Sequence, residues 1–243
     1  MSVLDLIDKA VRLDVSCVQI ADNLPLEGFS DADLATVKEY ADQHQVSLEV
    51  GARHLTPDRL RRYTEIAAYL ESRILRFVID GPDYAPTIAE VTEIIQAHLP
   101  ALEEHRICLA IENHDRLLST EFADLVRRVN SEWVGICLDT VNSMGAGEGL
   151  TTVIERLGPL AVNFHVKEFT VKRIYHMMGF EIEGLPLGTG MLPVPTVLHH
   201  LGAQCKTAIL EQWVPPEKDI QATIRKEERW AEESIRYLKR ALV

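Results

Sequence analysis

The chain has 243 residues and is acidic: 25 Lys and Arg stand against 37 Asp and Glu, a net charge of −12 at pH 7. Because nucleic acids and anionic membranes need a basic footprint, this balance excludes both as expected partners. Hydrophobic residues make up 47% of the chain, enough for a large core. The length suits one domain over residues 1–243, since α/β barrels commonly run to this size as a single unit.

The predicted elements alternate between helices and strands along the chain. An amphipathic helix opens it at Ser2–Leu13. Apolar, strand-like runs follow at Cys17–Ala21, Ser47–Val50, Ile74–Ile79, Ile107–Glu112, Val134–Asp139, Ala161–Val166 and Thr207–Glu211. Helical patterns lie between them at Ser30–Gln43, Thr56–Leu70, Thr87–Glu104 and Thr120–Asn130. Strands that alternate with helices of this length predict βαβ units and a parallel sheet.

The pattern favours a barrel over a doubly wound sheet. The chain contains no G-x-G-x-x-G turn, and polar residues end strands throughout the repeat. We therefore predict an α/β fold, a (β/α)8 TIM barrel that lacks its first N-terminal strand. Seven strands are recognisable, and a gap is expected where the first would lie. Either the chain begins downstream of its natural start, or the barrel is built without that strand.

Two segments depart from the repeat. Residues 168–194 form a long, glycine-containing stretch, typical of a lid or binding loop. Residues 220–243 form a charged amphipathic helix that is expected to close the barrel by packing Trp230, Ile235 and Leu238 against it. A helix that binds a partner is the alternative for this tail.

The cysteines and the apolar runs indicate the cellular compartment. Cys17, Cys108, Cys137 and Cys205 form no C-x-x-C pair, which argues against a thiolate zinc site. Buried free thiols suit a reducing cytoplasm. No apolar run approaches the ~18 residues of a membrane span, and the N-terminus lacks the layout of a signal peptide. We expect a cytoplasmic protein.

Four strands end in a carboxylate or an imidazole: Glu112, Asp139, His165 and Glu211. Parallel strands bring their C-terminal ends to one rim of a barrel, so these side chains are expected to converge. Three carboxylate oxygens and one imidazole nitrogen suit Mn²⁺, Mg²⁺ or Co²⁺, with Zn²⁺ also acceptable. The alternative is four separate strand-end residues, each paired or solvated.

Neighbouring polar residues are candidates for substrate binding. His114 follows the first of these strands, and Asn142 lies three residues beyond Asp139. Lys167 lies two residues past His165 and so points to the same side, whereas Arg173 falls in the long loop. Lys167 and Arg173 would hold a hydroxyl, carboxylate or phosphate group of a small anionic substrate.

Weaker hints come from the earlier strands. Gln19, Glu49 and Arg76 would line the rim if they point inward. Buried salt bridges within the barrel explain Glu49 and Arg76 equally well.

The chain resembles the xylose isomerase-like (AP endonuclease 2-type) TIM barrel superfamily, the sugar phosphate isomerase and epimerase family. The resemblance is strongest in IENHD (111–115), GICLDTVNS (135–143), FHVKEF (164–169), GLPLGTG (184–190) and LEQW (210–213). It implies that Glu112, Asp139, His165 and Glu211 bind one divalent metal ion, and that Glu112 and Glu211 form the acid/base pair. The family's epimerases usually have Asp-x-x-His, where this chain has Asn142.

The expected function is a divalent-metal-dependent isomerase or epimerase of a small sugar, sugar acid or sugar phosphate, working through an enediolate. One alternative is a metal-dependent lyase, a decarboxylase or dehydratase of a 3-oxo sugar acid, with Lys167 orienting the carboxylate. The other is a non-catalytic ligand-binding barrel. The expected partner is a small carbohydrate-derived substrate, and a homo-oligomer stays open.

Overall fold

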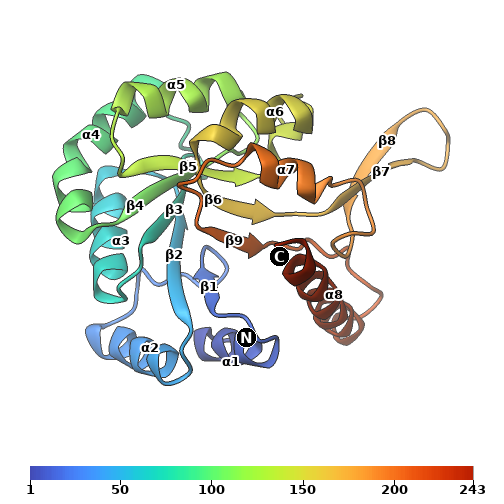
Figure 1. The fold of residues 1–243 in the computed structure, drawn as a ribbon, viewed down its shortest axis with the longest axis horizontal. Coiled ribbons are helices and arrows are strands. Elements are labelled where there is room, and N and C mark those ends of the chain that lie inside the picture. The colour runs from blue at the N-terminus through green and yellow to red at the C-terminus, as the bar shows by residue number, and fades with distance from the viewer. Residues whose placement is uncertain (243) are drawn as a thin grey trace.

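Seven parallel strands form the central sheet of the computed structural model, which describes residues 1–242. They are β1 (Cys17–Ile20), β2 (Ser47–Arg53), β3 (Ile74–Val78), β4 (Cys108–Glu112), β5 (Val134–Asp139), β6 (Ala161–Val166) and β9 (Thr207–Leu210), paired in that order. The sheet curls into a nearly closed barrel with helices around its outside (Figure 1). The predicted seven-stranded TIM barrel is therefore confirmed.

The helices follow the strands in alternation, as the sequence predicts. They are α1 (Val3–Arg12), α2 (Asp31–Gln43), α3 (Pro57–Tyr69), α4 (Ile88–His105), α5 (Ser119–Val129), α6 (Leu150–Leu157), α7 (Val194–His200) and α8 (Ile220–Ala241). Ser30, Thr56 and Thr87 are N-caps whose side chains accept from backbone amides of the first turn. The short helices α6 and α7 were not among the predicted elements.

The strands are apolar because both faces of the sheet are covered. Every residue of β3, β5 and β6 is buried, as expected for a parallel sheet with helices outside and packed side chains within. Phe77 and Phe164 are fully buried, with 0% exposure. The continuous apolar runs in the sequence thus reflect burial on two sides, and the charged residues Glu49 and Arg76 are exceptions within β2 and β3.

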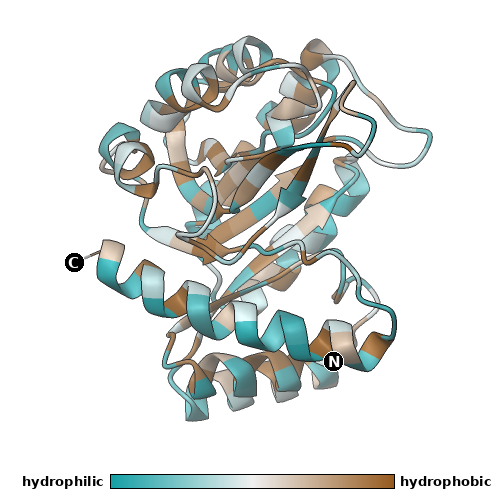
Figure 2. Cartoon of the chain, turned by 90° about the vertical axis from the view of Figure 1, so that its right-hand side faces the viewer, coloured by the Kyte–Doolittle hydropathy of each residue, from teal (hydrophilic) through white to brown (hydrophobic). Residues whose placement is uncertain are grey.

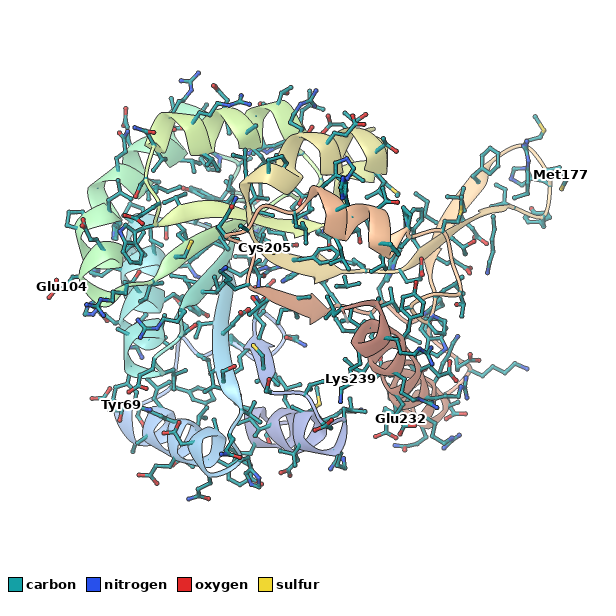
Figure 3. The ribbon with its side chains drawn as sticks, in the orientation of Figure 1. Tyr69, Glu104, Met177, Cys205, Glu232 and Lys239 are labelled. Carbon is teal, nitrogen blue, oxygen red and sulfur yellow. The ribbon has the colours of Figure 1, made fainter. Side chains whose placement is uncertain are left out.

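The barrel is open between its first and last strands. Among the residues that the structure describes, β1 pairs with β2 alone and β9 with β6 alone. A cavity of about 820 Å³ fills the opening, between α1 and α8 on the outside and the barrel interior on the inside. The expected gap at the first-strand position is therefore present. Lys239 of α8 lies beside it (Figure 3) and makes a 2.6 Å ion pair with Asp14.

The long segment after β6 is more ordered than a loop. It contains an antiparallel hairpin of β7 (Phe169–Arg173) and β8 (Phe180–Gly184), whose tip at Met177 projects far from the barrel (Figures 1 and 3). Tyr175 is 96% exposed there. The remainder turns back toward the barrel before α7 begins.

The C-terminal helix α8 is amphipathic, with polar and apolar residues alternating along its length (Figure 2). Trp230 and Leu238 are buried against the rest of the chain, and Ile235 is half-buried. Within residues 1–242, no helix combines the length and the apolarity that crossing a membrane requires.

Leu238 tests how much α8 contributes to stability. Its side chain is 5% exposed and packs in the main core. We expect Leu238→Ala to lower the free energy of unfolding by about 2–3 kcal/mol, because it removes buried methyl groups and leaves a void. Leu242→Ala, at a position that is 54% exposed, is the matched control and should change it by less than about 0.5 kcal/mol. Urea denaturation measures both. Equal effects would contradict a closing role for the helix.

Candidate metal centre

The four predicted ligands lie at the C-terminal ends of neighbouring strands. Glu112 ends β4, Asp139 ends β5, His165 is the penultimate residue of β6, and Glu211 directly follows β9. Asp139 and His165 are register partners across the β5–β6 ladder. The structure brings one ligand atom from each of the four residues within 4.8 Å of the others.

Unpartnered polar atoms face one another in this cluster. Within the described part of the chain, Asp139 Oδ2, His165 Nδ1 and Glu211 Oε2 are buried without a hydrogen-bond partner. His165 Nδ1 lies 2.7 Å from Glu211 Oε2 and 3.3 Å from Glu112 Oε2. Buried polar atoms usually have partners, so three orphans in one place indicate a missing cation. This donor set fits a divalent metal ion.

Backbone contacts fix Asp139 in place. Its Oδ1 accepts from the amides of Val141 and Asn142, both at 2.7 Å. Asn113 binds the strand end from the other side: its Oδ1 accepts from the Asp139 amide at 2.8 Å, and its Nδ2 donates to the Asp139 carbonyl at 3.0 Å. Only Oδ2 of this carboxylate is left free to bind a ligand.

Glu112 is held by two other side chains. Its Oε1 accepts from Asn142 Nδ2 at 2.8 Å, and its Oε2 accepts from Arg76 Nε. Arg76 also pairs with Asp22 at 3.2 Å. The salt-bridge explanation for Arg76 is therefore correct, and its partner is a predicted metal ligand. Glu112 is only 1% exposed, so this ion pair compensates much of the cost of burying its charge.

Lys167 places a second cation at the cluster. Its Nζ donates to Glu211 Oε1 at 2.8 Å and to Asn142 Oδ1 at 3.2 Å, and it lies 3.5 Å from Asp139 Oδ2. Burial opposes its charge, but the Asp139 and Glu211 carboxylates raise the pKa of Lys167 above its ordinary value. Lys167 is therefore an ammonium ion that lies beside two of the predicted metal ligands, Asp139 and Glu211.

The carboxylates and the imidazole perturb one another. Burial raises the pKa of Asp139 above its ordinary value. Burial also disfavours charge on Glu211, yet His165 and Lys167 hold the pKa of Glu211 below its usual range. Burial would lower the pKa of His165, but the Glu112 and Glu211 carboxylates raise it overall.

The structure separates the four predicted substrate residues. Asn142 and Lys167 contact the ligand cluster directly. His114 lies on the loop after β4, where its Nδ1 pairs with Asp115 at 3.0 Å. Arg173 lies on the hairpin, with its guanidinium 4.2 Å from the Phe180 ring centroid and a hydrogen bond to the Met177 carbonyl. The structure does not bring Arg173 to the cluster.

Glu168 is a site residue that the sequence analysis missed. It is 3% exposed, and its carboxylate accepts from the amides of Phe169, Gly188 and Leu192 at 2.8–3.0 Å. It thereby ties the segment after the hairpin to the end of β6. Gly188 has φ +85°, a conformation that a side chain would strain. No local sequence pattern identifies such an anchor, because two of its three partners are the backbone amides of Gly188 and Leu192, 20 and 24 residues away.

Comparisons with known proteins agree with this fold. A family model described as xylose isomerase-like TIM barrel matches residues 7–241. A protein of Pectobacterium atrosepticum named 3-oxo-isoapionate decarboxylase is 29% identical over 235 residues, or 96% of this chain and 86% of that one.

Solved structures show the same fold at low identity. D-psicose 3-epimerase of Clostridium cellulolyticum H10, solved with D-tagatose, has a TM-score of 0.75 at 16% identity and covers 98% of this chain and 93% of that one. A Mycobacterium smegmatis barrel in complex with magnesium has a TM-score of 0.71 at 11% identity, covering 99% and 89%. With the family match extending over residues 7–241, the chain belongs to the xylose isomerase-like TIM barrel family.

Proposed function

We propose that this protein is a divalent-metal-dependent lyase that removes CO2 from a 3-oxo sugar acid. The observation that carries the proposal is the Lys167 ammonium, 2.8 Å from Glu211 and 3.5 Å from Asp139. A cation beside a metal centre fits a substrate that has both a ketone and a carboxylate. The similarity to 3-oxo-isoapionate decarboxylase, over 96% of this chain, supports the same substrate class.

Glu112, Asp139, His165 and Glu211 would hold the metal ion, since one ligand atom of each lies within 4.8 Å of the others and all but Glu112 supply an orphaned atom. When bound, a divalent ion supplies a Lewis acid for the ketone oxygen. Mn²⁺, Mg²⁺ and Co²⁺ suit three carboxylates and one imidazole, and Zn²⁺ is a weaker match. The ligand set is too rich in carboxylates for a typical structural zinc site.

Lys167 would bind the substrate carboxylate and fix its orientation. In a 3-oxo acid, the bond between C1 and C2 breaks, and its electron pair moves toward the ketone at C3. CO2 leaves, and one proton from solvent replaces it at C2. The step needs no base to remove a carbon-bound proton. It therefore does not require Glu112 to release the hydrogen bonds that it accepts from Asn142 and Arg76.

Isomerisation or epimerisation through an enediolate is the competing function, with Glu112 and Glu211 as the proton-transfer pair. Both carboxylates lie at the cluster, as that chemistry requires. However, both oxygens of Glu112 already accept hydrogen bonds, and Glu211 is paired with Lys167. Asn142 cannot transfer a proton near neutral pH. These contacts support decarboxylation as the proposed reaction.

Metal binding depends on Glu211 in this proposal. The purified protein should take up one equivalent of Mn²⁺ or Co²⁺, and Glu211→Gln should weaken binding beyond the roughly 10–100-fold that loss of an outer-shell partner costs. Glu181→Gln, on the exposed hairpin strand β8, is the control and should bind as the wild type does. Calorimetric titration measures the affinities. Equal affinity in both variants would exclude Glu211 as a ligand.

Metal affinity should fall as the pH is lowered from about 7 to about 5, because ligands must be deprotonated to bind. Burial raises the pKa of Asp139, and the neighbouring carboxylates raise that of His165, so both take up protons in this range more readily than exposed groups. The protonated forms cannot coordinate. Titrations of Mn²⁺ at several pH values measure the effect, and an affinity that rises toward pH 5 would contradict the assigned ligands.

The activity test uses the metal-loaded protein with 3-oxo-isoapionate and follows CO2 release. We expect turnover in the wild type and a drop in kcat/KM of about 10–100-fold in Lys167→Met, since a hydrogen bond to a charged group contributes about 1.5–3 kcal/mol. Lys172→Met, on the exposed hairpin strand β7, is the control and should retain full activity.

Ketoses incubated in D2O separate this proposal from its alternatives. Solvent deuterium in a recovered ketose, without CO2 release from the 3-oxo acid, would favour the isomerase. Bound metal with neither reaction would favour a non-catalytic barrel.

A further inference from the structure

The nitrogen of His165 that faces away from the metal cluster contacts a single amide. His165 Nε2 lies 2.8 Å from Gln19 Oε1. His165 is on β6 and Gln19 on β1, the strand that borders the gap in the barrel. The contact therefore joins residues 146 positions apart across the barrel interior.

Glu49 determines which end of the Gln19 amide faces His165. Gln19 Nε2 donates to Glu49 Oε2 at 2.9 Å and to Asn163 Oδ1 at 3.2 Å. A carboxylate only accepts, so the NH2 group of Gln19 must point toward Glu49. The amide oxygen is then left to face His165.

Asn163 reinforces this arrangement from a second direction. Its Nδ2 donates to the same Glu49 oxygen at 3.0 Å and to Thr207 Oγ1 at 2.7 Å. Its Oδ1 accepts from Gln19 Nε2 and from the Cys137 thiol at 3.1 Å. Glu49 and Asn163 are 4% and 0% exposed, so these two partners of the half-buried Gln19 are shielded from water.

The amide orientation fixes the imidazole tautomer. An oxygen opposite Nε2 accepts a hydrogen bond, so Nε2 carries the proton and donates it. When the ring is neutral, its lone pair is then on Nδ1, the nitrogen that faces the ligand cluster. This is the form of histidine that binds a metal ion, and partners on the opposite nitrogen commonly set it.

We infer that Gln19 and Glu49 are positioning residues that hold His165 with Nδ1 free for the metal ion. The inference rests on the proposed metal site, and it adds two residues that belong to no ligand set. Gln19 acts on the imidazole, and Glu49 acts through Gln19. Loss of either would let the ring choose the tautomer with a proton on Nδ1, which cannot coordinate.

The first test removes the acceptor. Gln19→Leu should lower the affinity for Mn²⁺ by about 10–100-fold, the range typical for loss of an outer-shell partner. Thr64→Val is the control for loss of a buried hydrogen bond, because Thr64 is 3% exposed on α3 and donates to the Leu60 carbonyl at 2.7 Å. It should lower the melting temperature and leave the Mn²⁺ affinity unchanged. Unchanged affinity in Gln19→Leu would overturn the inference.

The second test exchanges the two side chains. Gln19→Glu alone sets two carboxylates against each other and should fold poorly. In the double variant Gln19→Glu/Glu49→Gln, residue 19 again presents an oxygen to His165, and the amide at position 49 donates to it. Most of the Mn²⁺ affinity lost in Gln19→Leu should return. A double variant that is as stable as the wild type yet binds as weakly as Gln19→Leu would count against the inference.

Nitrogen-15 NMR of the histidine side chains reads the tautomer directly, with the His165 signals assigned by their loss in His165→Gln. With diamagnetic Mg²⁺ bound, we expect the proton on Nε2 in the wild type, and a mixture of tautomers in Gln19→Leu at the same Mg²⁺ concentration. A wild-type protein that binds Mn²⁺ but releases no CO2 would refute the proposed reaction and leave this inference standing. A proton on Nδ1 in the Mg²⁺-bound wild type would refute the inference alone.

Discussion

Burial of like charges is the constraint on which this site depends. Glu112 and Asp139 are almost fully buried, and both lie within a few ångströms of Glu211. Such a group of carboxylates repels itself in a medium of low dielectric constant, so it persists only when cations lie among its members. Arg76 pairs with one carboxylate and Lys167 with another. The remaining unpaired oxygens define where a metal ion completes the balance.

These fixed cations also limit the chemistry. A carboxylate that is paired with an arginine and an amide is well placed to bind a metal ion and badly placed to exchange protons. Glu112 is in this position, which supports the proposed decarboxylation over proton transfer between two carboxylates. Lys167 has two roles in the proposed site, because it neutralises Glu211 and can bind an anionic substrate. The cations that stabilise the buried carboxylates therefore also limit the reactions that the site can support.

The fold and the convergence of four strand-end side chains could be predicted because each depends on local pattern. A polar residue at the end of a buried strand is visible in one line of sequence, and the barrel geometry brings Glu112, Asp139, His165 and Glu211 together. The contacts that tune them could not be predicted. Gln19 meets His165 across 146 residues, and the donor and acceptor ends of its amide are decided by Glu49 on a third strand. Arg173 failed to reach the cluster because the long segment forms a projecting hairpin.

The opening between β1 and β9 has a consequence for how the molecule is held together. Its two sides are joined on the surface by ion pairs such as Lys239 with Asp14, which contribute little in water. Inside, the Gln19–His165 hydrogen bond reaches from β1 to β6, the neighbour of the last strand. A metal ion at the proposed site would join β9 to β4, β5 and β6, but none of its ligands lies on β1. The Gln19–His165 hydrogen bond would therefore couple an occupied metal site to the first strand, so that binding of the ion would steady both ends of the open sheet.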